Sequence, residues 1–239
     1  MSQPSLIDCI AARAHAVSKL LCWVGMLLAS IPLAAFAATE AGGVGIAAIG
    51  VTDPVGGGRM PGFVFYPSTK AGEGTTAIGP YDVAAAFGVQ ERPGARPLVV
   101  ISHGHGGSNL GHHDLAAYLV RAGFIVATIE HPLDNFRDTS GNGQAAVMAG
   151  RPLQVSATIS ALLADPRWKR LVDADRIGVA GFSAGGYTSL LVAGAEPRFD
   201  RFLGYCERHP DDVGICGFVE QLGNGAKDAL DALQAGFAR

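Results

Sequence analysis

The segment IGVAGFSAGG, residues 177–186, leads from a short apolar run into a serine that lies between glycines. The run Ile177–Ala180 predicts an apolar β-strand, and the stretch from Ala184 to Ala195 predicts a helix. Ser183 is therefore expected on a sharp turn between the strand and the helix. Such a turn requires residues without a Cβ two positions before and after the serine, because strand and helix approach each other closely there.

The helix predicted after Ser183 would point its N-terminal N–H groups at the serine, where negative charge develops when a nucleophile attacks a carbonyl group. A G-x-S-x-G motif alone arises often by chance in a chain with 33 glycines, but the flanking strand and helix and the additional Gly186 favour an activated serine. We predict that Ser183 is a nucleophile on a turn formed by Gly181 and Gly185. The N–H of Ala184 is predicted to be one donor of an oxyanion hole.

A second glycine-rich turn, HGHGG at residues 103–107, follows the apolar run Leu98–Ser102. A turn of this kind after a strand can aim a backbone N–H at the oxyanion of a tetrahedral intermediate. We predict that the donor is the N–H of His105, acting together with the N–H of Ala184. His103 is expected to brace the loop rather than to act as a base. The alternative is a tight glycine turn with no catalytic part.

Apolar runs alternate with helical patterns from residue 97 onward. Strands are predicted at Leu98–Ser102, Phe124–Ile129 and Ile177–Ala180, the last as a third central strand. Strands that alternate with helices form crossover units and a parallel sheet, and chemistry gathers at the carboxyl ends of its strands. The two intervening helices are predicted from apolar residues that share a face: Leu115, Tyr118, Leu119 and Ala122, with a stop at Gly123, and then Val155, Ile159, Leu162 and Leu163.

The part of the chain from Ala38 to Arg96 predicts two short strands joined by loops. Phe63–Tyr66 is aromatic and β-branched and ends at Pro67-Ser68, as expected for a strand with a turn. The three glycines at 56–58 indicate a hairpin-like connection. A phosphate-binding loop is disfavoured there, because no lysine and no helix follow.

The composition is that of one globular domain. The chain has 239 residues, of which 49% are hydrophobic and 16% charged, and its formal net charge is −3. These values fit an α/β domain with a sizeable core and argue against disorder. They offer no basic face for nucleic acid or anionic lipid, so we expect no nucleic-acid partner.

The N-terminus has the layout of a secretory signal. Arg13 and Lys19 precede an uncharged stretch, Leu20–Ala38, that is rich in leucine and alanine and ends with the small-residue pattern Ala35-Phe36-Ala37. We predict a signal peptide over residues 1–37 and a mature domain over 38–239 in the periplasm or secreted, with no stable membrane span after cleavage. The alternative is a membrane anchor, since about 18 apolar residues could span a bilayer.

Export would leave two cysteines in the mature chain. Cys9 and Cys22 fall within the predicted signal, whereas Cys206 and Cys216 lie ten positions apart near the C-terminus. In an oxidising compartment we expect these two to form a disulfide, with two free thiols as the alternative. Neither has the strand-turn-helix context of a nucleophile.

The histidines around the glycine turn raise a metal site as an alternative; the candidate ligands are His103, His105, His112, His113 and Asp114. Metallo-hydrolases of the lactamase type carry H-x-H-x-D-H after an apolar strand. Here Gly107 and Ser108 occupy the positions of the aspartate and the third histidine, and the later histidines fall on different helix faces. We therefore expect no metal and no other cofactor.

These segments together resemble the α/β-hydrolases identified as predicted dienelactone hydrolases, which are relatives of the secreted platelet-activating-factor acetylhydrolases. The resemblance covers about residues 46 to 220 and implies a three-layer fold with a mostly parallel central sheet. It also implies hydrolysis of a carboxylic ester through an acyl-enzyme on Ser183. True dienelactone hydrolase uses cysteine as its nucleophile, so its substrate is not implied here. The segments that carry the resemblance are Phe63–Pro67, Pro97–Gly104, Glu130–Pro132 and Arg176–Gly186.

The chain departs from this family after Ser183. The family presents its triad in the order serine, acid, histidine, on loops after separate strands. Only His209 follows Ser183, and the acids before it are Glu196, Asp200 and Glu207. The ten or so residues between them cannot hold a strand-helix-strand crossover. We therefore assign no acid and no base, and expect the chain to stop before the last three strands; a shorter variant with a rebuilt triad is the alternative.

The sequence thus leaves three functions open. The first is an exported serine hydrolase that cleaves a small-molecule or lipid ester, such as a short acyl ester, a phospholipid acyl group or a lactone. The second is a non-catalytic α/β-hydrolase-like binding protein or an inactive fragment. The third is a metal-dependent hydrolase.

Overall fold

The computed structural model describes residues 42–70, 74–142 and 144–237. These residues belong to one compact unit, Ala41–Arg239. The predicted signal peptide, with Cys9 and Cys22, lies outside the described residues.

Six strands form one sheet in the order β5-β1-β2-β7-β6-β8. β6, β7 and β8 are mutually parallel, whereas β2 runs antiparallel to both of its neighbours, β1 and β7. A separate two-stranded ribbon pairs β3 with β4. The strands are β1 Val44–Thr52, β2 Arg59–Pro67, β3 Thr76–Ile78, β4 Tyr81–Val83, β5 Ala86–Phe87, β6 Arg96–Ser102, β7 Ile125–Ile129 and β8 Val172–Gly181.

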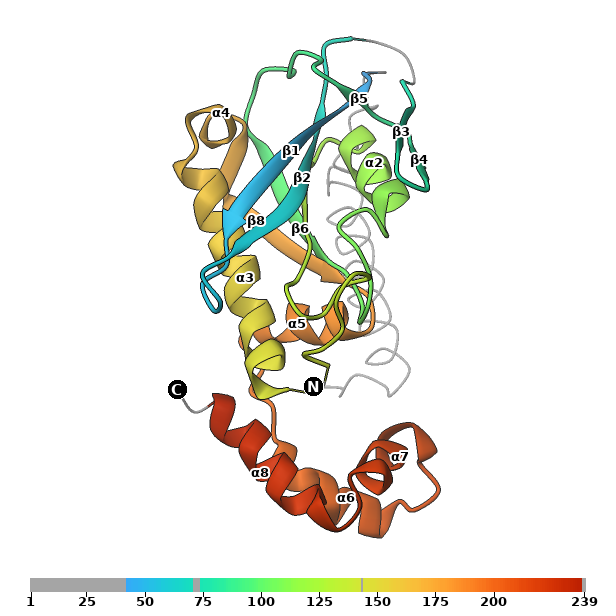
Figure 1. Ribbon diagram of the computed structural model, residues 1–239. Helices are drawn as coiled ribbons and strands as arrows, with labels where there is room; N and C mark the ends of the chain where they lie inside the picture. Colours follow the sequence, from blue (N-terminus) through green and yellow to red (C-terminus); the bar gives the residue numbers. More distant parts are fainter. Residues whose placement is uncertain (1–41, 71–73, 143, 238–239) are drawn as a thin grey trace, which may run out of the picture. The chain divides into compact units, whose positions relative to one another are not determined.

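Helices connect the parallel strands and follow the last of them. They are α2 His113–Arg121, α3 Ala145–Ala164, α4 Pro166–Lys169, α5 Ala184–Val192, α6 Phe202–Arg208, α7 Val213–Leu222 and α8 Ala226–Phe237, with short 3-10 helices at Phe199–Arg201 and Gly223–Gly225. Figure 1 shows α2 and α3 on opposite sides of the strands. The predicted crossover units and three-layer α/β architecture are therefore present.

The strands bury alternate side chains on the two faces of the sheet, as the two-residue period of a strand requires. One set packs with α3 and the other with α2, which gives each face its own hydrophobic cluster. Every residue of β7 is buried, as predicted for a strand covered on both sides. The α3 side contains Val64, Tyr66, Leu98 and Val100, and the α2 side contains Phe65, Ile101 and Val126.

The N-terminal part contains more sheet than predicted. Two short strands were expected before Arg96, whereas β1 and β2 are nine residues each and β3, β4 and β5 follow them. Glycine and alanine residues in β1 weaken the alternation of apolar and polar residues that would have predicted a strand. Pairing with β2 along the whole length of β1 stabilises the strand despite this weak pattern. The hairpin predicted at the glycines is present: Asp53 accepts the N–H groups of Val55 and Gly56 and closes the turn.

The predicted apolar face of α2 is wrong. Tyr118 is 67% exposed and Leu115 is 40% exposed, whereas Ala116, Ala117 and Val120 are buried against the sheet. Small side chains let the helix backbone approach β2 and β7 closely. Leu115 and Tyr118 are thereby left exposed, whereas Leu119, also predicted for this face, is half-buried and packs against the cluster on the α2 side.

β8 is longer than predicted and is not central. It pairs with β6 alone and forms the edge of the sheet in the described part of the chain. Its first residues, Val172 and Asp173, pair with Arg96 and Pro97, and the register then shifts so that Ile177 lies opposite Leu98. The residues of β8 at this shift are mostly polar. The first half of the strand therefore lacks the apolar pattern that would have predicted it.

The C-terminal segment is helical throughout its described residues. Cys206 on α6 and Cys216 on α7 are joined by a disulfide, with Cα atoms 5.5 Å apart, so the predicted pairing is present. Leu230 of α8 and Phe199 are buried together, next to Met148 of α3. In the described residues, no helix is both long enough and apolar enough to cross a membrane.

Candidate active site

Ser183 lies at the tip of the turn between β8 and α5. It precedes the first residue of α5 and has φ 52° and ψ −117°. Positive φ is unfavourable for a residue with a Cβ and costs about 1–3 kcal/mol, so the surrounding structure must impose it. The side chain is exposed. This strained, solvent-facing conformation is that of the serine in a nucleophile elbow.

The two glycines around Ser183 are required by close backbone contacts. A Cβ at Gly185 would lie 1.9 Å from the carbonyl oxygen of Ser102, and one at Gly181 would lie 2.2 Å from the backbone of Gly185. Either contact is far inside van der Waals distance. The spacing in the motif therefore has the physical cause that was predicted from the sequence.

The glycine turn, residues 103–107, runs beside this elbow. A Cβ on Gly104 would lie 3.5 Å from the Cβ of Ser183, so the backbone of the turn passes next to the serine. The N–H groups of His105 and Ala184 make no hydrogen bond within the described part of the chain. Both predicted oxyanion donors are thus free to bind an incoming group.

His103 and His131 brace the base of the glycine turn as neutral rings. His103 Nδ1–H donates to the carbonyl of Gly104 at 2.7 Å, and Nε2 accepts the N–H of His131 at 3.1 Å. Burial lowers the pKa of His103 to about 4, because a charged ring would be poorly solvated there. Burial, reinforced by the positive charge of Arg151, holds the pKa of His131 well below its usual value.

The neutral His131 ring joins a buried chain of hydrogen bonds. Its Nδ1–H donates to Gln154 at 2.7 Å, and its Nε2 accepts the hydroxyl of Ser102 at 2.8 Å. The amide of Gln154 in turn donates to Asp53 at 3.0 Å. The chain therefore connects the β1–β2 turn through α3 to the carboxyl end of β6.

Arg151 of α3 is the largest fully buried side chain, with 2% exposure. Its Nε donates to Thr188 at 3.1 Å, its Nη1 donates to Asp134 at 2.5 Å, and its Nη2 donates to Ser102 at 3.2 Å and to the carbonyl of His103. Burial lowers the pKa of the guanidinium, and the Asp134 carboxylate opposes that effect. A buried cation is tolerated here because each nitrogen has a partner.

Asp134 connects Arg151 to the glycine turn. Its Oδ1 accepts Nδ1–H of His105 at 2.5 Å and the N–H of Gly106 at 3.2 Å, while its Oδ2 faces Arg151. The His105 side chain is 42% exposed. One carboxylate thus holds two neighbouring residues of the turn from below.

Comparison with solved structures identifies the architecture. The chain superposes on a ferulic acid esterase from Streptomyces cinnamoneus with a TM-score of 0.56 and 23% identity, over 66% of this chain and 57% of the esterase. The chain has the α/β-hydrolase fold. It spans less than two thirds of that esterase. No known family model and no curated protein matches it.

Two further solved structures of this fold match less well. A dienelactone hydrolase-like promiscuous phosphotriesterase from metagenomic libraries superposes with a TM-score of 0.41 and 21% identity, over 62% of this chain and 54% of that protein. A puromycin-hydrolyzing peptidase of Mycobacterium tuberculosis superposes with a TM-score of 0.45 and 17% identity, over 70% of this chain and 22% of the peptidase.

No described residue occupies the place of the α/β-hydrolase base. The Ser183 hydroxyl makes no hydrogen bond within the described residues. His209 ends α6 and stacks on Tyr205, with ring centroids 4.6 Å apart. Asp200 pairs with Arg198 at 2.6 Å, and Glu196 and Glu207 are exposed. That this chain holds no triad acid and no triad base stays a prediction from chain order.

The buried polar residues beneath the site were not predicted from the sequence. Asp134 lies in the loop after β7, which ends at Ile129. In α/β folds functional groups gather at such strand ends, and this position was the available signal for Asp134. Arg151 and Gln154 lie on the buried face of α3 among apolar residues, and a helical pattern alone does not distinguish a buried polar residue from a surface one.

The histidines considered as metal ligands contact different side chains. His112 lies against Phe182 and His113 against Tyr81, while His103 and His105 are held as described above. Within residues 42–70, 74–142 and 144–237, no three histidine, cysteine or acidic side chains gather as a metal site would require.

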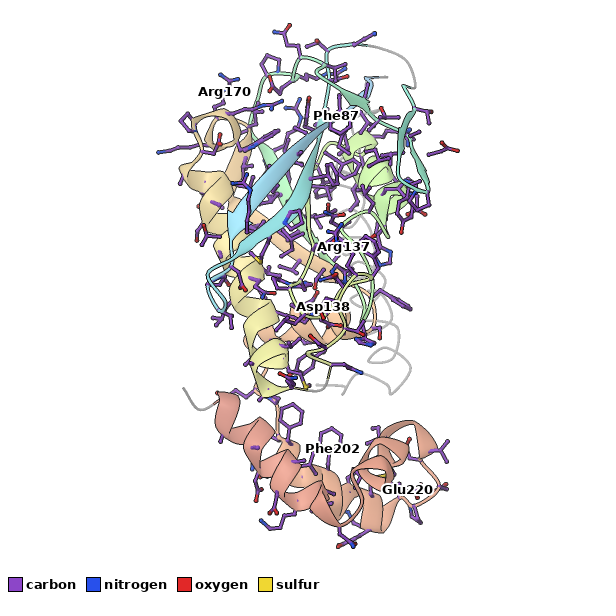
Figure 2. The ribbon with its side chains drawn as sticks, viewed as in Figure 1. Phe87, Arg137, Asp138, Arg170, Phe202 and Glu220 are labelled. Atoms are coloured by element: carbon purple, nitrogen blue, oxygen red, sulfur yellow. A yellow bond between two sulfur atoms is a disulfide. The ribbon has the colours of Figure 1, made fainter. Side chains whose placement is uncertain are left out.

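An apolar pocket of about 310 Å³ opens next to the glycine turn. The N–H of Phe136 donates to the carbonyl of Gly107 at 2.9 Å, and Tyr81 shares a 3.2 Å hydrogen bond with Ser108, so the pocket wall is continuous with the turn. Arg137, labelled in Figure 2, pairs with Glu130 in the wall. The main lining residues are Phe63, Ile78, Tyr81, Leu110, Phe136 and Arg137.

Proposed function

We propose that this chain carries the nucleophile of an exported serine hydrolase that cleaves a carboxylic ester through an acyl-enzyme on Ser183. The observation that carries the proposal is the strained conformation of Ser183, φ 52°, on a turn built from obligatory glycines. Strain of this kind is retained where a function needs it.

In the proposed reaction, the Ser183 oxygen forms a bond to the ester carbonyl carbon while its proton passes to a general base. The carbonyl oxygen becomes an oxyanion, which the N–H groups of His105 and Ala184 receive. Collapse of this intermediate breaks the bond to the alcohol, which leaves with a proton. Water then attacks the acyl-enzyme by the same route and releases the carboxylic acid.

The proposed substrate is a small-molecule or lipid ester with an apolar acyl or alcohol group. The pocket beside the glycine turn is lined by aromatic and aliphatic side chains, and its volume of about 310 Å³ is at the lower end for small-molecule sites. The N-terminal signal pattern and the disulfide between Cys206 and Cys216 support export, because disulfides persist in oxidising compartments.

The test is covalent labelling of the protein as its host produces it. The protein is treated with a fluorophosphonate, digested and analysed by mass spectrometry for the modified residue. We expect the phosphonyl group on Ser183 and release of acid from a short-chain ester, with both lost in Ser183→Ala. Modification elsewhere, or ester turnover that survives in Ser183→Ala, would refute the proposal.

A non-catalytic binding protein is the second candidate, and the unpartnered Ser183 hydroxyl favours it. A serine without a base is a weak nucleophile. This candidate predicts that apolar esters bind in the pocket and are recovered intact, with the same affinity for wild type and Ser183→Ala.

A further inference from the structure

We propose that Arg151 is a positioning residue that fixes the glycine turn and the helix carrying Ser183 relative to each other. The inference rests on the proposed function, because it concerns the two backbone N–H groups expected to bind the oxyanion. It starts from the guanidinium of Arg151, whose three nitrogens reach three separate elements.

One branch leads from Arg151 to the helix. Nε donates to the hydroxyl of Thr188 at 3.1 Å, and that hydroxyl donates to the carbonyl of Ala184 at 2.8 Å. Ala184 is the first residue of α5, and its N–H is one of the two predicted oxyanion donors. Arg151 therefore reaches the residue that carries this donor through a single side chain, which bonds the carbonyl group of that residue.

The second branch leads to the glycine turn. Nη1 donates to Asp134 at 2.5 Å, and Asp134 accepts His105 Nδ1–H at 2.5 Å and the N–H of Gly106 at 3.2 Å. The N–H of His105 is the other predicted donor. A single carboxylate again separates it from Arg151.

The third branch fixes the strand end between the two donors. Nη2 donates to Ser102 and to the carbonyl of His103, where β6 ends. Gly185 packs against the backbone carbonyl groups of the same two residues, Ser102 and His103, so the position of this strand end determines how closely α5 can approach. The guanidinium thereby holds α5 and the glycine turn, which carry the two proposed donors, in fixed positions relative to the end of β6.

Only arginine can make this arrangement. Its donors form a rigid planar fork, whereas lysine places three donors on one flexible point. A lysine at position 151 keeps the charge opposite Asp134 but cannot hold Thr188 and Ser102 as well. Buried ion pairs contribute little net stability compared with apolar packing, which favours a role in geometry.

The test uses the full chain and compares Arg151→Lys and the nearly isosteric Thr188→Val with wild type. Arg167→Lys is the matched control, because Arg167 also combines an ion pair, with Glu91, and a hydroxyl contact, with Tyr66, away from the site. Two readouts are taken on folded protein. They are the saturation kinetics of Ser183 labelling by a fluorophosphonate and amide hydrogen exchange in peptides covering 103–110 and 183–192.

We expect both site variants to lower the maximal labelling rate by about 10- to 100-fold without changing the concentration for half-saturation, because misplaced donors affect the transition state and not initial binding. Amide exchange should rise in both peptides and stay unchanged in Arg167→Lys. If Arg151→Lys does not fold, Thr188→Val alone decides.

The two proposals fail separately. Faster exchange in the variants of a protein whose wild type never labels at Ser183 would refute the serine hydrolase and leave the positioning role intact. Wild-type labelling kinetics and exchange in a folded Thr188→Val or Arg151→Lys variant would overturn the positioning role.

Discussion

Gly185 packs so closely on the end of β6 that a Cβ there would meet the Ser102 carbonyl oxygen at 1.9 Å and that of His103 at 2.9 Å. Both atoms belong to backbone, so relief requires α5 to move away from the sheet. We expect Gly185→Ala to lower the free energy of unfolding by about 1–3 kcal/mol or more, measured by urea denaturation, and to abolish labelling of Ser183.

The adjacent glycine is the control for this prediction. A Cβ at Gly186 meets its nearest atom, the carbonyl oxygen of Gly181, at 3.5 Å, which is ordinary contact. Gly186→Ala should therefore be neutral or stabilising by up to about 1 kcal/mol, because alanine is the better helix former. Equal effects of the two substitutions would contradict the packing argument.

Because the pKa of His103 is lowered, we expect the free energy of unfolding to decrease in mild acid. The pKa of this histidine is about 4 in the folded protein, because of burial, against an ordinary value of 6.5. Between these values the unfolded chain binds a proton that the folded chain does not, so the free energy of unfolding falls as the pH is lowered from about 6.5 to about 4. The loss amounts to roughly 3 kcal/mol, and the lowered pKa of His131 adds to it in the same direction.

The measurement is a series of urea denaturation curves between pH 4 and 7.5. His103→Asn, which removes the titrating ring, should show a shallower dependence over this range. A wild-type stability that stays constant between pH 6.5 and pH 4.5 would show that His103 is readily protonated in the folded state.

The exposed edge of β8 leads to a prediction about aggregation. β8 is an edge strand in the described part of the chain, and next to it Phe182 and Leu190 are 67% and 63% exposed. Unprotected edges promote pairing between molecules, and lysine on an edge blocks it. A Cβ at Gly178 would meet nothing within 4 Å, so Gly178→Lys should fold normally and lower aggregation, measured by light scattering at increasing concentration.

Gly58, in the turn between β1 and β2, offers the matched control, since a Cβ there also meets nothing within 4 Å. Gly58→Lys adds the same charge far along the chain from β8. If both variants reduce scattering equally, net charge and not the sheet edge is responsible.

The sequence predicted best the segments whose own residues carry a clear local pattern. The apolar runs of β6 and β7 and the turn around Ser183 follow from local pattern, since strand, glycine and helix signals agree there. β1 and the first half of β8 were missed because their pairing partners, and not their own residues, determine them. The polar contacts of Arg151 join residues up to 49 positions apart, and no local period encodes such contacts.

At the scale of the molecule, the described residues contain the proposed nucleophile and the two proposed oxyanion donors, and the Ser183 hydroxyl makes no hydrogen bond among them. His209, the only histidine that follows Ser183 in the sequence, stacks on Tyr205. The superposition with the ferulic acid esterase covers 57% of that protein. For the proposed hydrolase, the geometry of the nucleophile and the transfer of its proton can therefore be tested separately.

The consequence is a distinctive pH dependence of Ser183 labelling in residues 1–239. A histidine base with an ordinary pKa near 6.5 makes the rate level off above about pH 7. Without a base in the protein, hydroxide must remove the serine proton. We therefore expect a slow labelling rate that rises by roughly tenfold per pH unit from pH 7 to 9. Added imidazole, a diffusible base, should accelerate labelling in proportion to its concentration, and Ser183→Ala should show neither effect. A rate that levels off near pH 7 and ignores imidazole would mean that a histidine of this chain reaches Ser183 in solution.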